Sequence, residues 1–378
     1  MKNLFTSEAV SEGHPDKLCD QISDAILDEC LLQDVNSRCA VECFFSNELL
    51  VIGGEISTMA KINYEKIARD IIKNVGYDDS TIGVDYRTVE IIINISTQSP
   101  DISQGVDRVN EIGAGDQGMM FGFAINETES LMPYPIMIAN DLVHIATKLR
   151  KKGIFKFAKP DMKSQVTIDY TNKANPRIDT ILMSVQHDKN YDKNIFEKFI
   201  KDNIMKVIAL RYNLNTDYSV LINPTGKFVI GGPKGDTGLT GRKIMVDTYG
   251  GFSRHGGGAF SGKDYTKVDR SASYMCRYAA KNIVAAGIAD CIEIQVSYAI
   301  GVSKPIAIYF ETFGTNKISN EVISNILKTE FDFSVGGLIN YLDLKNVGYL
   351  RTSKYGHFGK KEFPWEKLDM NNKLIKYL

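Results

Sequence analysis

The sequence predicts an α+β fold rather than a doubly wound α/β sheet. Helical and strand-like segments are mixed along the chain without strict strand–helix alternation, which is typical of the α+β class. A chain of 378 residues is long enough for two or three domains, or for one unusually large one. No low-complexity tract or long linker divides it, and inspection reveals no sequence repeat.

The N-terminal part is predicted to form a helix, two strands, a second helix and a third strand, over residues 15–33, 40–45, 49–56, 61–75 and 89–97. The first helix carries a stripe of apolar side chains and has Pro15 near its start, where proline is favoured. The first two strands are joined at Asn47, a residue that tolerates turn conformations.

Residues 98–118 have a different character, because they are polar, rich in glycine and without period. A loop of this length is usually a functional lid or a disordered segment. The rest of the chain predicts helices over 134–152, 190–210 and 271–286, and strands over 166–170, 180–186, 291–301 and 305–313, which close the ordered body.

The composition is that of an ordinary globular protein, with 43% hydrophobic residues and a formal net charge of −1. This balance argues against a dedicated nucleic-acid binder, which would show a basic excess. We expect no signal peptide and no membrane span, because no apolar run is long enough. The six cysteines are scattered and form no C-x-x-C pair, which favours reduced structural thiols and a cytoplasmic location.

The segment GGGAFSGKD at 256–264 is the most informative motif. Its glycines expose consecutive backbone N–H groups, and Lys263 supplies a positive charge for an anion. It resembles a Walker A loop, but Asp264 stands where that loop needs a Ser or Thr for magnesium. The motif alone predicts either a phosphate-binding loop of another kind or a plain glycine turn.

A second candidate is SEGHPDK at 11–17, at the start of the first predicted helix. Free N–H groups and the helix dipole favour an anion there, so His14 could bind a phosphate oxygen and Asp16 a hard cation. The alternative is simple capping. Asp16, Asp20, Asp24 and Asp28 recur at i+4, which by itself usually means one solvated face.

Two further segments combine cations with glycines or carboxylates. GGPKGDTGLTGRK at 231–243 could cradle a polyphosphate with Arg242 and Lys243, or could be an exposed hairpin. DYTKVDRS at 264–271 suits a metal–phosphate site, with surface ion pairing as the alternative.

Weaker candidates are Lys163, Glu42 and five polar residues of the long loop that could close over a substrate: Asp101, Asp107, Arg108, Asp116 and Gln117. The sequence has no nucleophile elbow and no H-E-x-x-H motif. It therefore favours positioning and charge neutralisation of a phosphate-rich substrate over covalent catalysis.

Six motifs, in this order and spacing, resemble the signatures of the S-adenosylmethionine synthetase (methionine adenosyltransferase) family: SEGHPDK, GAGDQG at 113–118, KSQV at 163–166, GGPKGDTGLTGRK, DTYGG at 247–251 and GGGAFSGKD. The resemblance covers the chain from residue 4 to about 366. It implies synthesis of S-adenosylmethionine from ATP and L-methionine, followed by hydrolysis of the released triphosphate to diphosphate and phosphate. Methionine sulfur is already a good nucleophile, so the enzyme must mainly align it and stabilise the departing polyanion.

The resemblance also implies roles for individual residues. Those implied at the triphosphate, with catalytic roles, are His14, Lys163, Arg242, Lys243 and Lys263. Further ATP-contacting positions are Asp161, Lys227, Phe228, Asp236 and Ala259, with Phe228 near adenine. Methionine-binding positions are Glu55, Gln98, Asp116, Asp236 and Lys267. Asp16 and Asp269 would hold Mg²⁺, and Glu42 would bind K⁺. Lys227 departs from the arginine of many relatives, which keeps the charge but loses the forked geometry.

The fold implied by the resemblance is α+β, with three similar βα subdomains about a pseudo-threefold axis. The expected segments are an N-terminal subdomain 1–98, a mobile active-site loop and connection 99–112, a central subdomain 113–230 and a C-terminal subdomain 231–378. A homodimer with shared active sites, assembled further as a dimer of dimers, is also implied. Two alternatives are an ATP-dependent kinase or ligase and a non-catalytic nucleotide-binding regulatory subunit.

Overall fold

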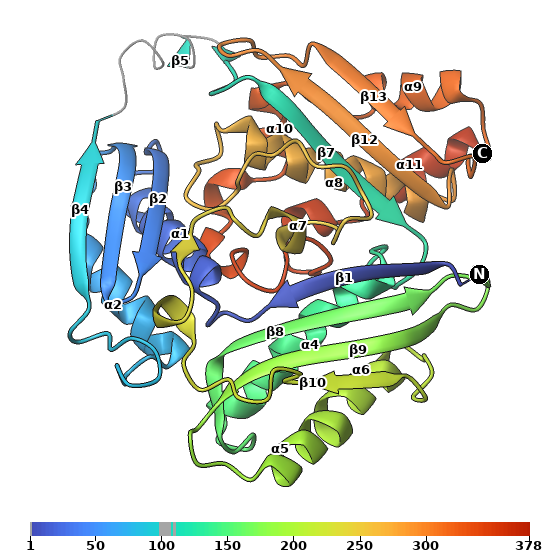
Figure 1. Cartoon of the computed structure of the whole chain (residues 1–378). Helices are drawn as coiled ribbons and strands as arrows, with labels where there is room; N and C mark the ends of the chain where they lie inside the picture. The colour runs from blue at the N-terminus through green and yellow to red at the C-terminus, as the bar shows by residue number, and fades with distance from the viewer. Residues whose placement is uncertain (1, 98–106, 109–110) are drawn as a thin grey trace.

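Three units of mixed α/β content, each a sheet packed against helices, make up the protein in the computed structural model (Figure 1). The structure describes residues 2–97, 107–108 and 111–378. The sheets lie at the left, bottom and upper right of Figure 1, and the loop that carries β11 and α7 runs between them.

The first sheet has the order β11-β2-β3-β4, formed by Gly238–Leu239, Arg38–Ser46, Leu49–Ser57 and Glu90–Ser96. The second has the order β1-β8-β9-β10, formed by Leu4–Val10, Ala158–Asp169, Arg177–His187 and Ser219–Ile222. The third has the order β13-β12-β7, formed by Ala307–Glu311, Cys291–Tyr298 and Gly118–Ile125. A short pair, β5-β6, joins Asp107–Arg108 to Glu111–Ile112.

Each unit receives a strand from a different part of the chain. β1 pairs antiparallel with β8, β7 with β12, and β11 with β2. The N-terminal segment therefore contributes a strand to the second sheet, the central segment to the third, and the C-terminal segment to the first. This cyclic exchange ties the three units together.

The order of elements is also repeated. In the N-terminal and central segments of the chain, the strand that joins another unit (β1 or β7) is followed by a long helix and an antiparallel hairpin. One or more further helices then lead to a strand parallel to the second hairpin strand. The C-terminal segment follows the same order from β11 through α8 to the hairpin β12-β13 and helix α9. No sequence repeat reveals this similarity.

The helices supply the buried faces of the units. The long helices α1, α4 and α8 span Pro15–Gln33, Tyr134–Lys151 and Val268–Ala285. The remaining α-helices are α2 (Tyr64–Val75), α5 (Lys193–Phe199), α6 (Lys206–Arg211), α7 (Ile244–Asp247), α9 (Asn320–Thr329), α10 (Val335–Tyr341) and α11 (Asn371–Leu374). Two buried apolar clusters result, one under the second sheet and one shared by the other two units.

Several predicted elements are confirmed and several are corrected. The helix over 15–33 and the turn at Asn47, which has φ +51°, are as expected. The helix over 190–210 is interrupted by a π-helical stretch, Ile200–Met205. The strands at 166–170 and 180–186 are only parts of β8 and β9, because the first half of β8 is too polar to show an apolar pattern. Residue 313 does not close the ordered body, since α9, α10 and α11 follow it.

The expected active-site loop, 99–112, lies largely outside the described residues. In the part of the chain that the structure describes, no helix combines the length and apolarity needed to cross a bilayer. All six cysteines are free and buried.

Candidate active site

The four aspartates spaced at i+4 on α1 do not form a solvated face, so that reading of the sequence is wrong. Asp16, Asp20 and Asp24 are buried, and Asp28 is partly buried. Each carboxylate accepts at least one backbone N–H from a distant segment: Asp16 from Leu239 (2.9 Å), Asp20 from Gly241 (2.9 Å), Asp24 from Gly262 (2.9 Å), and Asp28 from Tyr349 (2.5 Å) and Leu350 (2.8 Å). We call these four residues the aspartate ladder. It holds both glycine-rich loops against one helix.

The N-terminus of α1 gathers the first group of predicted site residues. Asp16 accepts a hydrogen bond from Lys243 Nζ (2.5 Å), and Arg242 Nε lies 3.8 Å from the same carboxylate. Pro15 occupies the first turn and His14 is the N-cap, so the free N–H groups of this end are beside two cations. The structure thus brings His14, Asp16, Arg242 and Lys243 together.

His14 is held in its neutral form. Burial, together with the charges of Lys243 and Lys163, lowers the pKa of His14 well below its ordinary value. Its Nδ1 accepts the Asp16 N–H at 3.2 Å, so the ring proton is assigned to Nε2. A neutral imidazole with a free Nε2–H is a hydrogen-bond donor for an anion.

The loop 256–264 carries the second group. Lys263 Nζ donates to Asp269 Oδ2 at 2.5 Å, and a Cβ on Gly258 would lie 2.2 Å from the Asp269 carboxyl carbon. A Cβ on Gly241 would lie 2.3 Å from that of Ala259. The two glycine-rich loops are therefore in contact, and their glycines are required for the close approach.

Asp264, which replaces the Walker Ser or Thr, is a structural anchor. Its carboxylate accepts the Cys39 N–H (2.8 Å) and bonds to Lys267 Nζ (2.6 Å). Thr266 donates to its other oxygen through both N–H and Oγ1. These contacts fix the turn between the loop and helix α8.

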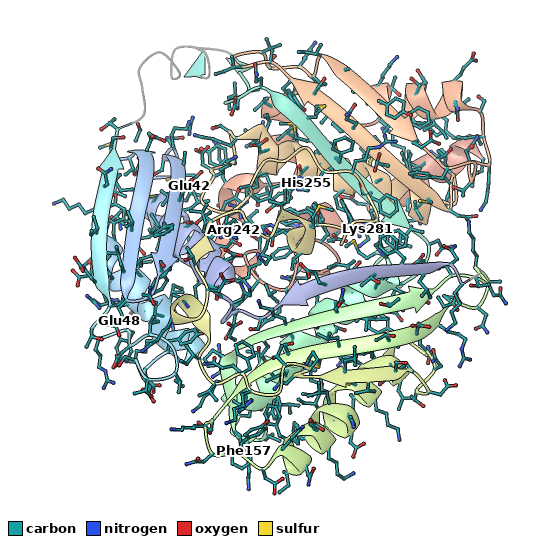
Figure 2. All side chains as sticks on the ribbon, viewed as in Figure 1. Glu42, Glu48, Phe157, Arg242, His255 and Lys281 are labelled. Atoms are coloured by element: carbon teal, nitrogen blue, oxygen red, sulfur yellow. The ribbon has the colours of Figure 1, made fainter. Side chains whose placement is uncertain are left out.

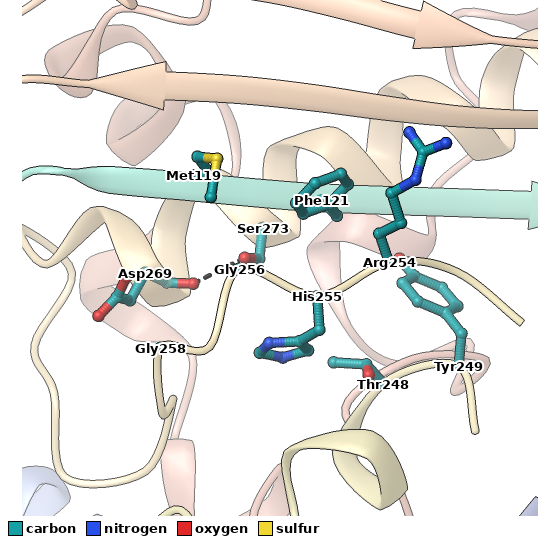
Figure 3. Close-up of a pocket in the computed structure, with 10 residues that line it drawn as sticks. All are labelled: Met119, Phe121, Thr248, Tyr249, Arg254, His255, Gly256, Gly258, Asp269 and Ser273. Atoms are coloured by element: carbon teal, nitrogen blue, oxygen red, sulfur yellow. Dashed lines mark hydrogen bonds between the residues drawn. The ribbon is translucent and has the colours of Figure 1, made fainter. Parts of the chain in front are cut away.

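Figure 3 shows a small pocket beside Asp269, in which the ring of His255 lies between Gly258 and Thr248. The Gly257 N–H donates to His255 Nδ1 at 2.8 Å, which again leaves Nε2 to carry the ring proton. Burial lowers the pKa of His255, although the Asp269 charge opposes this. His255 was not singled out from the sequence.

Lys163, Asp161 and Asp236 lie near the first group. Lys163 is exposed on β8, opposite Val10 of β1, and its positive charge contributes to the lowered pKa of His14. Asp161 is buried and accepts the Gly232 N–H at 2.9 Å; burial raises the pKa of this carboxyl to about 6. Asp236 is exposed in the loop that follows Gly232, and its N–H donates to the Gly232 carbonyl at 3.1 Å.

The predicted nucleotide-contacting residues Lys227 and Phe228 lie in an irregular segment after β10. Lys227 is exposed and Phe228 is half-buried. The Phe228 backbone is anchored on β9, where its N–H donates to His187 Nε2 at 3.1 Å and its carbonyl accepts the His187 N–H at 2.9 Å.

Glu42 and Glu55 point to the open face of the first sheet. Glu42 pairs in register with Gly53, two residues before Glu55, and both glutamates are exposed. Figure 2 shows Glu42 and Arg242 near the middle of the molecule, whereas Glu48 lies at the far end of its sheet. Ala40, the register partner of Glu55, forms a bridge with Lys263.

The remaining predicted methionine-binding residues are only partly described. Asp116 is exposed, and Gly115 N–H donates to Thr266 O at 3.2 Å, which brings this segment beside Lys267. Gln98 lies outside the described residues.

The donor set suits cations that share their coordination with a phosphate ligand. Within residues 2–97, 107–108 and 111–378, no group of three or more His, Cys, Asp or Glu side chains is arranged to hold a metal ion. Magnesium commonly uses one or two carboxylates and completes its shell with substrate phosphates and water. Asp16 and Asp269 each offer one carboxylate beside the cations of a glycine-rich loop, which fits that mode.

Comparison with known proteins shows the family to which the chain belongs. Three family models match consecutive parts of the chain: S-adenosylmethionine synthetase N-terminal domain at 2–100, central domain at 111–228 and C-terminal domain at 230–367. The chain belongs to the S-adenosylmethionine synthetase family. It is an enzyme of the methionine adenosyltransferase class.

Curated relatives named S-adenosylmethionine synthase match over the full chain. The protein from Mycoplasma mycoides subsp. mycoides SC is 64% identical over 377 residues, which is 100% of this chain and 97% of the relative. The Mesoplasma florum protein is 62% identical over 370 residues, 98% of each chain. The Clostridium botulinum protein is 49% identical over 391 residues, 100% of each chain.

The sequence motifs of the S-adenosylmethionine synthetase family contain the charged residues of the candidate site. They do not reveal the buried residues whose hydrogen bonds hold the loops of this site in place. Asp20, Asp24 and His187 were missed as contributors to the site. A signal existed for the ladder, because a helix with four aspartates on one face can accept the N–H groups that glycine-rich loops expose.

Proposed function

We propose that the protein makes S-adenosylmethionine from ATP and L-methionine by in-line attack of the methionine sulfur on ribose C5′. The released triphosphate is then hydrolysed to diphosphate and phosphate. The observation that carries this proposal is the joint placement of two glycine-rich basic loops against α1, with His14 at the helix N-terminus. Such a site neutralises a departing polyanion.

The cationic residues and the neutral His14 have different roles in this reaction. Lys163, Arg242, Lys243 and Lys263 hold the triphosphate and stabilise the negative charge that grows on the leaving oxygen. Neutral His14 donates a hydrogen bond from Nε2, which orients the polyphosphate without adding a proton to it. No general base is required, since the sulfur attacks as the free thioether.

Further residues bind the methionine and the nucleotide, and Asp236 contributes to both groups. Glu55, Gln98, Asp116, Asp236 and Lys267 bind methionine, and Asp161, Lys227, Phe228 and Ala259 contact the nucleotide. The contact between Gly115 and Thr266 supports a common role for Asp116 and Lys267, because it brings their segments together.

Divalent and monovalent cations complete the site in this proposal. Asp16 and Asp269 would hold Mg²⁺, and Glu42 would hold K⁺. When bound, Mg²⁺ would neutralise phosphate charge and supply Lewis-acid stabilisation of the leaving triphosphate, and K⁺ would add positive charge near Glu42. In the structure, the positive charges of Lys243 and Lys263 neutralise the carboxylates of Asp16 and Asp269, respectively.

We further propose a homodimer with shared active sites that assembles as a dimer of dimers in the cytoplasm. Large apolar side chains stand exposed on strands of all three sheets, including Phe44, Leu221 and Met119. Phe44 and Glu42 are on the same face of β2, so a second copy that covers this face would also enclose Glu42.

The repeated element order supports a pseudo-threefold axis and subdomains 1–98, 113–230 and 231–378, linked by an active-site loop at 99–112.

The test is an incubation with ATP, L-methionine, Mg²⁺ and K⁺, followed by mass analysis of the products. We expect S-adenosylmethionine with equal amounts of diphosphate and phosphate. ADP without a sulfonium product would instead indicate a kinase, and absence of turnover would indicate a regulatory subunit.

A further inference from the structure

Two buried residues at the end of β9, Gln186 and His187, anchor the segment that contains Lys227 and Phe228. Both side chains are fully buried, and their polar atoms are hydrogen-bonded to backbone groups. They form hydrogen bonds with the backbone of this segment. We call this pair the β9 clamp.

His187 is hydrogen-bonded to both backbone polar groups of Phe228. Its N–H donates to the Phe228 carbonyl at 2.9 Å, and its Nε2 accepts the Phe228 N–H at 3.1 Å. Since Nε2 is the acceptor, the ring proton is assigned to Nδ1, which donates to the Asp188 carbonyl at 2.8 Å.

The imidazole ring cannot turn freely out of this arrangement. It stacks on Tyr191 with a centroid distance of 3.7 Å and meets the edge of Phe196 at 5.6 Å. Aromatic packing on two sides therefore fixes the direction of Nε2.

Gln186 joins the same segment to other parts of the site. Its Nε2 donates to the Val229 carbonyl (2.9 Å) and the Ile82 carbonyl (2.7 Å), and its Oε1 accepts the Asp161 N–H (3.2 Å). A Cβ on Gly231 would lie 2.7 Å from the Gln186 side chain. The side-chain amide of Gln186 is thus hydrogen-bonded to Val229 and Asp161, and it packs against Gly231, where the segment 231–243 begins.

We propose that Gln186 and His187 are positioning residues for the nucleoside of the substrate. They set the place of Phe228 and Asp161 relative to the phosphate cradle without touching the ligand. This rests on the proposed function, in which Phe228 and Asp161 contact ATP. The clamp acts on the nucleoside end of the site, whereas the aspartate ladder holds the phosphate end.

The experiment compares two substrates that share the phosphate site. Formation of S-adenosylmethionine from ATP and L-methionine requires that the nucleoside be correctly positioned. Hydrolysis of inorganic tripolyphosphate does not, because tripolyphosphate has no nucleoside. His187→Phe keeps the ring packing on Tyr191 and removes the acceptor for Phe228. We expect KM for ATP to rise about tenfold, the size of one lost hydrogen bond, while tripolyphosphate hydrolysis stays within about twofold.

A conservative pair keeps the test decisive if His187→Phe does not fold. The amide of His187→Gln can reach the position of Nε2, whereas that of His187→Asn reaches only the position of Nδ1. We expect His187→Gln to recover most of the ATP affinity and His187→Asn to behave like His187→Phe. His144→Phe, whose ring stacks on Tyr355 in another part of the unit, is the matched control and should leave both activities unchanged.

Equal loss of ATP turnover and tripolyphosphate hydrolysis in these variants would overturn the proposal, because it would show a general structural role. An unchanged KM for ATP would also overturn it. A parent protein that produces no S-adenosylmethionine would instead contradict the proposed function itself.

Discussion

Replacing Asp24 by Asn should strongly destabilise the protein, because Asp24 is the centre of the aspartate ladder. Its Oδ1 accepts from Arg270 Nη1 (2.7 Å) and Gly262 N–H (2.9 Å), and its Oδ2 accepts from Arg270 Nη2 (2.8 Å). Arg270 is also buried, and its guanidinium lies over the Tyr349 ring at 4.2 Å. The substitution leaves this cation in the interior without its counter-charge.

Removing one partner of a buried ion pair costs about 3–5 kcal/mol. We expect Asp24→Asn to lose free energy of unfolding in this range, since the new amide also directs N–H groups toward the Arg270 donors. The loss is measured by urea unfolding followed by circular dichroism, at equal protein concentration for parent and variant because association contributes to stability.

The matched control is Asp70→Asn on α2. Asp70 pairs with Lys66 at 2.7 Å, but both side chains are more than half exposed. Such pairs contribute about 0.2–1 kcal/mol. A loss below about 1 kcal/mol in Asp24→Asn, or a loss equal to that of the control, would refute the role given to the ladder.

Three further predictions concern the site. Lys163→Met should reduce S-adenosylmethionine formation far more than ATP binding, measured by turnover and by calorimetric titration; near-normal turnover would contradict its role. Asp269→Asn should shift the Mg²⁺ dependence of both transfer and triphosphate hydrolysis to higher concentration, and an unchanged magnesium titration would refute it. Because burial raises the pKa of Asp161 to about 6, ionising this group costs stability as pH rises from 3.8 through 6, and the full cost is present above pH 6. Asp161→Asn keeps an acceptor for Gly232 and should be more stable than the parent at pH 8, by up to about 3 kcal/mol, but not at pH 3. Equal unfolding curves at pH 8 would contradict this.

The charged groups of the candidate site could be proposed from the sequence because their chemistry is local. Lys263 beside a run of glycines and His14 at a predicted helix start are visible as candidates for anion binding without knowledge of the fold, although a glycine turn and simple capping remain the alternatives. The ladder could not be predicted in the same way. A periodic aspartate face is normally solvated, and it becomes a buried anchor only when loops more than 200 positions away offer their N–H groups.

The exchanged strands were missed for a related reason. β1 interrupts its apolar alternation with Ser7, which is buried because its hydroxyl donates to the Gly250 carbonyl at 2.7 Å. β7 contains Gly122, where a Cβ would lie 2.1 Å from the Cys276 backbone of α8. In both strands the pattern is set by a distant segment, so a local reading of the sequence could not find it.

Strand exchange and the ladder together explain how the site is assembled. β11 pairs with β2 at Phe45 and Phe44, and this fixes where the basic loop leaves the first sheet. The loop then passes directly along α1, within reach of Asp16 and Asp20. The cations Arg242 and Lys243 follow at once, so their position depends on a strand from the C-terminal segment and a helix from the N-terminal one. Neither segment could hold the two cations beside α1 without the other.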